Sequence, residues 1–247
     1  MKLSIKNLST GYSGKTVLKD LNLQAQSGDF IVLLGKNGAG KSTLIKTLSG
    51  IISYQSGDFF IDDIPCAKLS KKEWATYVSV VLTDRIDIAL PVREFIGLGR
   101  QAFTNKWDML SKQDKEVVNQ VIEQLHITNY SDKQIDELSD GERQKVLIAR
   151  ALVQETPVIL LDEPTAHLDL ENKAIIFRLL KELAEKQNKI IIVSTHDINL
   201  ILPVVDKIWL ANNHSISEIN SNSKEIIELF DSKNILFDRS CGIFKLA

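Results

Sequence analysis

Three segments of the chain are continuously apolar and short enough to be strands. They are "FIVLL" at 30–34, "PVILLD" at 157–162 and "KIIIVST" at 189–195, and they are rich in valine and isoleucine. Strands buried on both faces have this composition, whereas half-buried strands alternate apolar and polar residues. Because segments with helical periodicity lie between them, these runs predict a parallel sheet.

Two segments near the N-terminus alternate instead. "LSIKNL" at 3–8 and "LNLQAQ" at 21–26 have an apolar residue at almost every second position, which is typical of half-buried strands. We expect both strands to lie at the edge of an antiparallel part of the sheet. Together with the apolar runs, they predict an α/β protein with a mixed N-terminal sheet.

Apolar residues recur with helical spacing in several other segments. In the first of them, Leu44, Ile45 and Leu48 share one face, and Gly50 marks the end of the helix. The predicted helices span 41–50, 111–125 and 171–186, with a short candidate at 223–230. We expect one domain over 1–247, with a largely helical insertion at about 84–153 and a short tail at about 213–247.

Composition excludes several classes of protein. The chain has 247 residues, a net charge of −2, 44% hydrophobic residues and 25% charged residues, which is ordinary for a soluble domain. The near-neutral charge gives no indication of nucleic-acid binding. Cys66 and Cys241 lack the spacing of a zinc site or a disulfide framework. Neither a signal peptide nor a membrane-spanning run is evident, so we expect a soluble protein that a membrane partner could hold.

The stretch "GKNGAGKST" begins where the first apolar run ends and matches the pattern G-x-x-x-x-G-K-[ST]. Small residues let backbone N–H groups surround phosphate oxygens, and the N-terminus of the following helix adds its dipole. Lys41 is expected to reach the β- and γ-phosphates, and the Ser42 hydroxyl to bind Mg²⁺. The strand before the loop and the helix after it favour this function over a simple glycine turn. The predicted nucleotide-binding loop comprises Gly35, Lys36, Asn37, Gly38, Ala39, Gly40, Lys41, Ser42 and Thr43.

Two carboxylates, Asp162 and Glu163, follow the second apolar run. A carboxylate at the end of a buried strand beside a phosphate loop can hold Mg²⁺ through water, and Asp162 is the candidate for this role. Glu163 is expected to point to an attacking water. It is the candidate general base, an effect worth about 10²- to 10⁴-fold in rate.

A third motif, "LSDGERQKVLIARAL", has Ser139 followed three residues later by Glu142, which is the spacing of a capping box. The local pattern alone favours a helix that is simply well capped. A helix start that carries serine and glycine is also an anion site. Both interpretations stay open for this segment taken by itself.

In their order along the chain, these motifs resemble those of the ATP-binding cassette proteins, the nucleotide-binding subunits of ABC transporters. "GKNGAGKS" is similar to the Walker A loop of that family, "VILLDE" to its Walker B strand, and "LSDGE" to its signature "LSGGQ". The resemblance covers nearly the whole chain, to about residue 215. It implies a P-loop NTPase core with a mixed sheet, an N-terminal antiparallel β subdomain and an inserted helical subdomain.

The resemblance also assigns roles to single residues. Tyr12 matches the aromatic residue that stacks on adenine, His196 matches the switch histidine at the γ-phosphate, and Asp169 ends the D-loop "TAHLD". Glu163 and His196 are therefore the expected catalytic residues, with ATP and Mg²⁺ as ligands. The signature residues, which would close on the nucleotide of a second copy, are Ser139, Gly141 and Glu142.

Two departures from the family pattern matter. Asp140 and Glu142 replace a glycine and a glutamine of the signature, and this variant is similar to that of importers for siderophore, haem and cobalamin complexes, as is "VREFIGLGR". Thr83 stands where the family has the Q-loop glutamine, which touches Mg²⁺ and the attacking water. A threonine hydroxyl is shorter and could act there only through a water molecule.

Similarity to this family implies a cassette that hydrolyses ATP to drive import of a metal chelate. The expected partners are a second copy of the chain, a polytopic permease docked around 84–110 and, indirectly, a substrate-binding protein, with no nucleic acid. The expected location is the cytoplasmic face of the inner membrane.

Three alternatives remain: an export cassette, a soluble cassette acting on ribosomes or DNA, and a nucleotide-regulated binding module. A single Walker A loop without a heptad run or a basic stretch disfavours the soluble cassette. The presence of both Glu163 and His196 disfavours a binding module without turnover.

Overall fold

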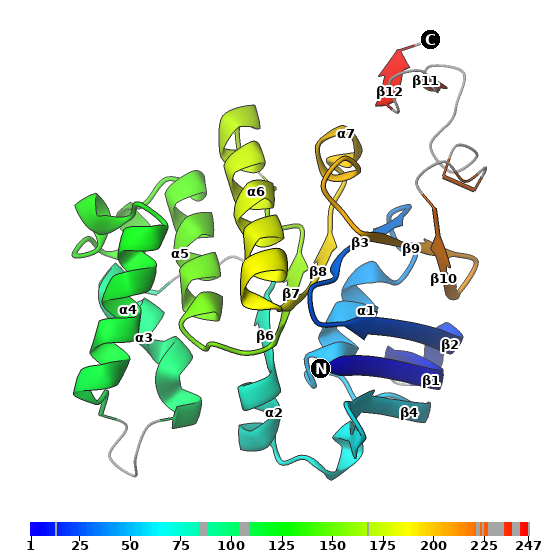
Figure 1. Ribbon diagram of the computed structural model, residues 1–247, viewed down its shortest axis with the longest axis horizontal. Coiled ribbons are helices and arrows are strands. Elements are labelled where there is room, and N and C mark those ends of the chain that lie inside the picture. The colour runs from blue at the N-terminus through cyan, green and yellow to red at the C-terminus, as the bar shows by residue number, and fades with distance from the viewer. Residues whose placement is uncertain are drawn as a thin grey trace.

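A six-stranded sheet forms the centre of the protein (Figure 1). The computed structural model describes residues 1–12, 14–83, 88–103, 109–166, 168–220, 223, 225–226, 235–238 and 243–246. The strand order is β10-β9-β3-β8-β7-β6, in which β9 and β10 are antiparallel and the other neighbours are parallel. The strands are β3 (Phe30–Gly35), β6 (Val78–Val81), β7 (Val158–Asp162), β8 (Ile190–Ser194), β9 (Lys207–Asn212) and β10 (Ser215–Ile219). The three apolar runs thus form the adjacent parallel strands β3, β8 and β7, and the predicted parallel sheet is confirmed.

Parallel pairing brings the carboxyl ends of these three strands to one edge of the sheet. Ser194, the last residue of β8, pairs with Leu33 of β3 on one side and with Asp162 of β7 on the other. Residues that follow β3, β7 and β8 in the sequence therefore meet in space.

A second, antiparallel sheet has the order β2-β1-β4-β5. Its strands are β1 (Lys2–Tyr12), β2 (Lys15–Gln26), β4 (Ser56–Ile61) and β5 (Ile64–Pro65). The expectation that both N-terminal strands lie at an edge is wrong for β1, which pairs with β2 and β4. Residues 3–5 and 8–11 of β1 are buried on both faces of the strand. An alternating pattern predicts which residues face the core, but it does not predict how many neighbours a strand has.

Alternate residues of β3 contribute to two separate hydrophobic cores. Val32 and Leu34 pack with residues of the long helices on one face of the sheet. Ile31 and Leu33 pack with the first helix and with the antiparallel sheet on the other face. The central sheet therefore lies between a helical layer and a mixed layer (Figure 1).

The helices include those that helical periodicity predicts at 41–50, 111–125 and 171–186. They are α1 (Lys41–Leu48), α2 (Lys71–Tyr77), α3 (Val92–Gly97), α4 (Lys112–Gln124), α5 (Asp140–Leu152), α6 (Leu170–Gln187) and α7 (Ile198–Ile201), with 3₁₀ turns η1 (Cys66–Lys68), η2 (Leu98–Phe103), η3 (Thr128–Tyr130) and η4 (Ile135–Glu137). The predicted helical insertion is confirmed, because α3, α4 and α5 follow one another between β6 and β7. Helix α2 was not predicted, although its capping box of Ser70 and Glu73 is visible in the sequence.

The C-terminal part adds β10 and a hairpin of β11 (Ile235–Asp238) and β12 (Ile243–Leu246). The side-chain amide of Asn199 in α7 donates to the Phe244 carbonyl at 2.9 Å and accepts from the Phe244 N–H at 2.8 Å. Most of the predicted helix at 223–230 lies outside the described residues. Among the described helices, none combines the length and the apolar character that crossing a bilayer requires.

A buried ion pair holds the helical insertion together. The Arg100 guanidinium, 7% exposed, lies 2.8 Å from the Asp114 carboxylate, which is 8% exposed. Arg100 also donates to the Val153 carbonyl at 2.7 Å and to Glu155 at 2.6 Å. One side chain of η2 is thus bound to α4 and to the end of α5.

We expect Arg100→Met to destabilise the protein by about 3–5 kcal/mol, because Asp114 would be left as a buried charge without its cation. Urea unfolding measures the loss. Lys186→Met is the control, since the Lys186–Glu182 pair is 71% and 50% exposed and should be worth about 1 kcal/mol or less. Equal losses in the two variants would contradict the prediction.

Candidate active site

Two glycines let the loop between β3 and α1 turn tightly. Gly40 precedes α1 with a φ of 97°, and a Cβ atom there would lie 2.8 Å from Leu18 Cγ in β2. A Cβ atom on Gly35, at the end of β3, would lie 2.6 Å from the Ala211 carbonyl oxygen in β9. Only glycine fits at either position, so the close packing of β2 and β9 around the loop fixes its path.

The rest of the predicted loop is open to solvent at its tip. Residues 36–38 and Ser42 are exposed, Ala39 is half-buried and Thr43 is buried. The Ala39 N–H donates to the Lys36 carbonyl at 3.1 Å and closes the turn. A ligand can therefore reach the loop from solvent.

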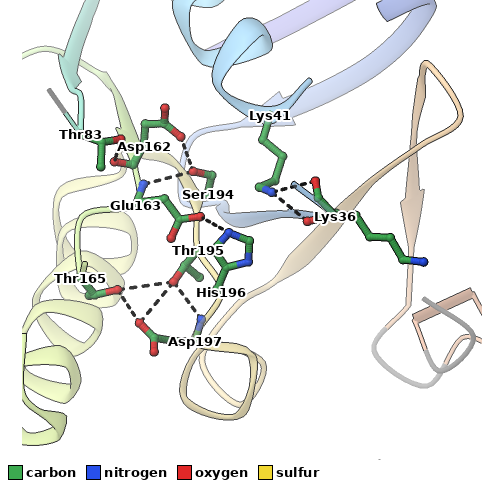
Figure 2. A network of polar contacts seen from close by, with 11 residues as sticks. Lys36, Lys41, Thr83, Asp162, Glu163, Thr165, Ser194, Thr195, His196 and Asp197 are labelled. Atoms are coloured by element: carbon green, nitrogen blue, oxygen red, sulfur yellow. Dashed lines mark hydrogen bonds and ion pairs between the residues drawn. The ribbon is translucent and has the colours of Figure 1, made fainter. Parts of the chain in front are cut away.

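Lys41 begins α1 and turns its ammonium back into the loop. The residue is 7% exposed, and Nζ donates to the Gly35 carbonyl at 2.8 Å and to the Lys36 carbonyl at 3.3 Å (Figure 2). Burial lowers the pKa of Lys41, and the nearby charges of Glu163 and Asp162 oppose this shift. An ammonium group that is already desolvated binds anionic oxygens more strongly than neutral carbonyl oxygens, because hydrogen bonds between charged groups are stronger.

The ends of β7 and β8 form the opposite side of the site. Asp162 is 3% exposed, and its Oδ1 accepts a hydrogen bond from Ser194 Oγ at 2.5 Å. The Glu163 N–H donates to Ser194 Oγ and to the Ser194 carbonyl, both at 3.1 Å. A single serine thus fixes both residues that carry the carboxylates (Figure 2).

Glu163 has a left-handed backbone with a φ of 49°, which is strained for a residue with a long side chain. Its Oε1 is buried and accepts no well-formed hydrogen bond within the described residues, although His196 Nε2 lies 3.0 Å away. Burial raises the pKa of Glu163, and the charges of His196 and Lys41 oppose the increase. The carboxylate is therefore partly desolvated and has a free acceptor site beside the imidazole.

Two more predicted residues lie around this centre. Thr83 Oγ1 donates to the Asp162 carbonyl at 3.2 Å, so the residue at the Q-loop position does border the site. Tyr12, 49% exposed, ends β1 where the chain turns into β2, the strand that contacts the loop at Gly40.

The predicted signature lies apart from the loop in a single chain. Helix α5 contacts α3, α4 and β6, whereas α1 contacts β1, β3 and β7 (Figure 1). The Ser139 hydroxyl donates to Glu142 Oε2 at 2.7 Å and accepts from the Glu142 N–H at 3.3 Å, which confirms the capping box. Asp140 is paired with Arg143 at 3.2 Å and is 64% exposed. Within the described residues, the Ser139 hydroxyl has no hydrogen bond to the loop.

Asp169 caps α6 and lies near the signature. Its Oδ1 accepts from the Asn172 N–H at 2.8 Å, and this hydrogen bond lowers the pKa of Asp169. A Cβ atom on Gly141 would lie 3.4 Å from Leu168 Cδ2. The start of α5 and the segment before α6 are thus side by side.

Sequence reasoning missed the polar residues that connect the motifs. Ser194 joins Asp162 to Glu163, and Asp197 accepts from Thr165 Oγ1 at 2.7 Å and from Lys173 Nζ at 2.7 Å. The only signal available was the polar end of "KIIIVST" and the aspartate after His196.

The residues of the site fit a nucleoside triphosphate. The loop is held open at its tip, the Lys41 ammonium is bound only by carbonyl oxygens within the described chain, and Glu163 Oε1 is an unsatisfied acceptor. The described residues include no cluster of three or more histidine, cysteine or acidic side chains that could hold a metal alone. The Ser42 hydroxyl and the Asp162 carboxylate are the oxygen donors that would hold Mg²⁺, which usually takes one or two protein ligands and completes its shell with phosphate oxygens and water.

Comparison with known families agrees with this geometry. Residues 18–166, which include β3, the loop, the signature and β7, match the ABC transporter family. The chain belongs to this family. It is an ATP-binding subunit of the ABC type.

The matching relatives cover almost the whole chain. An ABC transporter ATP-binding protein of Methanocaldococcus jannaschii is 36% identical over 99% of this chain and 86% of its own length. The petrobactin import ATP-binding protein of Bacillus subtilis is 34% identical over 87% of this chain and 84% of its own.

Solved structures of ABC proteins share the fold. A transporter described as metal-chelate type, in an inward-facing conformation, superimposes with a TM-score of 0.80 at 28% identity and covers 98% of this chain and 94% of its own. A dimeric ATP-binding cassette in a post-hydrolysis state with ADP and Pi gives a TM-score of 0.77 at 26% identity, over 88% of this chain and 98% of its own. The chain is an ABC ATPase with the P-loop NTPase fold predicted from its sequence.

We expect Gly40→Ala to destabilise this ATPase more than Gly38→Ala does, by about 1–3 kcal/mol, because a methyl group at position 40 overpacks against Leu18. Both glycines have positive φ, so the strain of the left-handed backbone is common to the two variants, and nothing lies within 4 Å of a Cβ on Gly38. Urea unfolding without nucleotide isolates the difference. Equal stability of the two variants would mean that Leu18 can move aside.

Proposed function

We propose that this ABC ATPase powers import of a metal chelate, such as a siderophore, haem or cobalamin complex, through a separate permease at the cytoplasmic face of the inner membrane. The buried carboxylate of Glu163, unsatisfied and facing His196, is the observation that carries the hydrolytic role. The class of cargo is supported by the petrobactin import relative and by the metal-chelate type neighbour. The variant signature "LSDGE" points to the same class.

Glu163 is the proposed general base for the attacking water. A base near neutral pH is most effective when its pKa is raised toward that pH, and burial raises the pKa of this carboxyl. His196 Nε2 lies 3.0 Å from Oε1 and would contact the γ-phosphate. Both groups are held by backbone that follows a buried strand, so little reorganisation is needed before reaction.

Lys41 and the loop would hold the triphosphate. The Lys41 ammonium would leave the Gly35 and Lys36 carbonyls for the phosphate oxygens. Ser42 and, through water, Asp162 would hold Mg²⁺, which neutralises negative charge on the phosphates. Ser194 keeps Asp162 in place for this role by its 2.5 Å hydrogen bond.

The working unit is proposed to be a dimer with ATP between the copies. Ser139 and Gly141 of one copy would close on the nucleotide bound to Lys41 of the other, with Asp169 at the same interface. The separation of α5 from α1 within one chain supports this, because neither motif completes the site alone. The dimeric structural neighbour supports it as well.

The permease is proposed to dock in a cleft of about 1010 Å³ between the end of α1, α2, η2 and the end of α5. Ile51 and Leu98, 54% and 38% exposed, line this cleft. Trp74 also lines it, and the indole N–H of Trp74 is buried without an acceptor in the described chain. A short helix with apolar side chains would fit. Of the predicted docking region at 84–110, residues 84–87 and 104–108 lie outside the described residues.

We expect Glu163→Gln to bind ATP with wild-type affinity and to lose about 10²- to 10⁴-fold in turnover, because the amide cannot accept a proton from water. Titration with a fluorescent ATP analogue and a phosphate-release assay measure the two effects. Lys41→Ala, in contrast, should lose tight binding of ATP. Near-normal turnover in Glu163→Gln would remove this residue from the role of base.

We expect a tagged chain purified from its own membranes in mild detergent to bring down a polytopic permease. Ile51→Asp should abolish this while leaving the ATPase activity of the free protein within about twofold, because a charge in the cleft opposes docking of an apolar helix. Ile175→Asp is the matched control, since Ile175 is 48% exposed on α6 and outside the cleft. Recovery of ribosomal proteins or nucleic acid instead of a permease would contradict the transport function.

A further inference from the structure

A second polar cluster lies next to the Glu163–His196 pair, below it in Figure 2, and is centred on Asp197. Asp197 Oδ2 accepts from Thr165 Oγ1 at 2.7 Å, and Oδ1 accepts from Lys173 Nζ at 2.7 Å. The carboxylate thus has a separate partner for each oxygen. One partner belongs to the segment after β7 and the other to α6.

The cluster is buried where it joins the two segments. Thr165 is 0% exposed and Thr195 is 1% exposed. Thr195 Oγ1 accepts from the Asp197 N–H at 3.1 Å and lies 3.4 Å from Thr165 Oγ1. The turn after β8 is therefore tied to the turn after β7 by hydrogen bonds of the buried Thr165 and Thr195 hydroxyls.

These two turns also carry the side chains of the proposed catalytic pair, Glu163 and His196. Glu163 lies two residues before Thr165, and His196 immediately precedes Asp197. Glu163 Oε1 has no well-formed hydrogen bond of its own among the described residues, and the His196 side chain is 52% exposed. Because the two turns carry the backbones of Glu163 and His196, the 3.0 Å separation of the two side chains depends on where the turns hold them.

We propose that Asp197 is a positioning residue that fixes the Glu163–His196 pair by joining the turn after β7, helix α6 and the turn after β8. It does not touch the reacting atoms. This inference rests on the proposed roles of Glu163 and His196. A displacement of about 1 Å in such a pair is enough to cost about 10²-fold in rate.

The chain contains a matched ion pair that does not serve this role. Lys181 lies on the same helix and pairs with Asp206 at 2.7 Å, with exposures of 23% and 39% against 23% and 22% for Lys173 and Asp197. Within the described part of the chain, Lys181 and Asp206 form no hydrogen bond or ion pair with a residue assigned to the site. Differences between the two pairs therefore separate positioning from general support of α6.

The first experiment compares steady-state ATP hydrolysis by the full-length chain in the variants Asp197→Asn, Lys173→Met and Lys181→Met. We expect Asp197→Asn and Lys173→Met to lower kcat about 10- to 100-fold with a KM for ATP within about threefold of wild type. Lys181→Met should change kcat by less than about twofold. Thermal unfolding of each variant checks that the protein is folded. A kcat loss that merely follows the fall in melting temperature across all three would overturn the proposal.

Thr165 provides a test by conservative rescue. Thr165→Ser keeps the hydroxyl that donates to Asp197 and should retain kcat within about threefold, whereas Thr165→Val keeps the shape and should lose about as much as Asp197→Asn. Equal activity of the serine and valine variants would show that the side chain only fills space and would overturn the proposal.

A double variant distinguishes failure of this inference from failure of the assigned base. If Asp197 acts through Glu163, adding Asp197→Asn to Glu163→Gln should lower the residual single-turnover rate by less than about threefold, since the two effects are not additive. Full additivity would contradict the positioning role. Wild-type turnover in Glu163→Gln alone would instead contradict the base, whatever Asp197→Asn does.

Discussion

The parallel register of β3, β8 and β7 is the constraint on which the rest of the structure depends. Ser194 pairs with a residue of each neighbouring strand, so the loop after β3 and the carboxylates after β7 are brought to the same edge of the sheet. A shift of one residue in β7 would turn Asp162 to the opposite face and Glu163 away from His196. This register is costly to change, because every residue of β3, β7 and β8 is buried and nearly all of them are apolar.

The charges of the site are arranged before any ligand is present. Lys41 is buried and its ammonium is bound by carbonyl oxygens, while Glu163 and Asp162 are close enough to shift its pKa. Burial disfavours the charged form of both Lys41 and Glu163, and their mutual attraction opposes this. Nucleotide binding therefore replaces the partners of charged groups that are already desolvated. This is the condition under which charged groups stabilise a transition state strongly.

The sequence was sufficient to predict those parts of the site that depend on residue types in a fixed local order. The loop from Gly35 to Lys41 could be predicted because backbone sterics require glycine at defined positions between a strand and a helix. Ser194 and Asp197 could not be predicted, because their roles arise from strand pairing across more than 30 residues of chain, as in the Ser194–Asp162 hydrogen bond. The interior position of β1 was missed for a similar reason. Alternation of apolar and polar residues shows which side chains face the core, but it does not show how many strands pair with β1.

The capping box at the start of α5 has a consequence for the proposed closed dimer. A serine hydroxyl has one proton, and Ser139 already donates it to Glu142 Oε2. To donate to a phosphate of the partner copy, Ser139 must release Glu142 Oε2, so this carboxylate and the phosphate compete for the same hydrogen atom, while the hydroxyl oxygen can still accept from the Glu142 N–H and cap the helix. A stronger hydrogen bond from the Ser139 hydroxyl to Glu142 therefore means a weaker one from Ser139 to the nucleotide across the interface. The glutamate in this chain is charged where the family has a neutral glutamine, and the hydrogen bond from Ser139 lowers the pKa of Glu142, so Glu142 holds the Ser139 proton more strongly than a glutamine would.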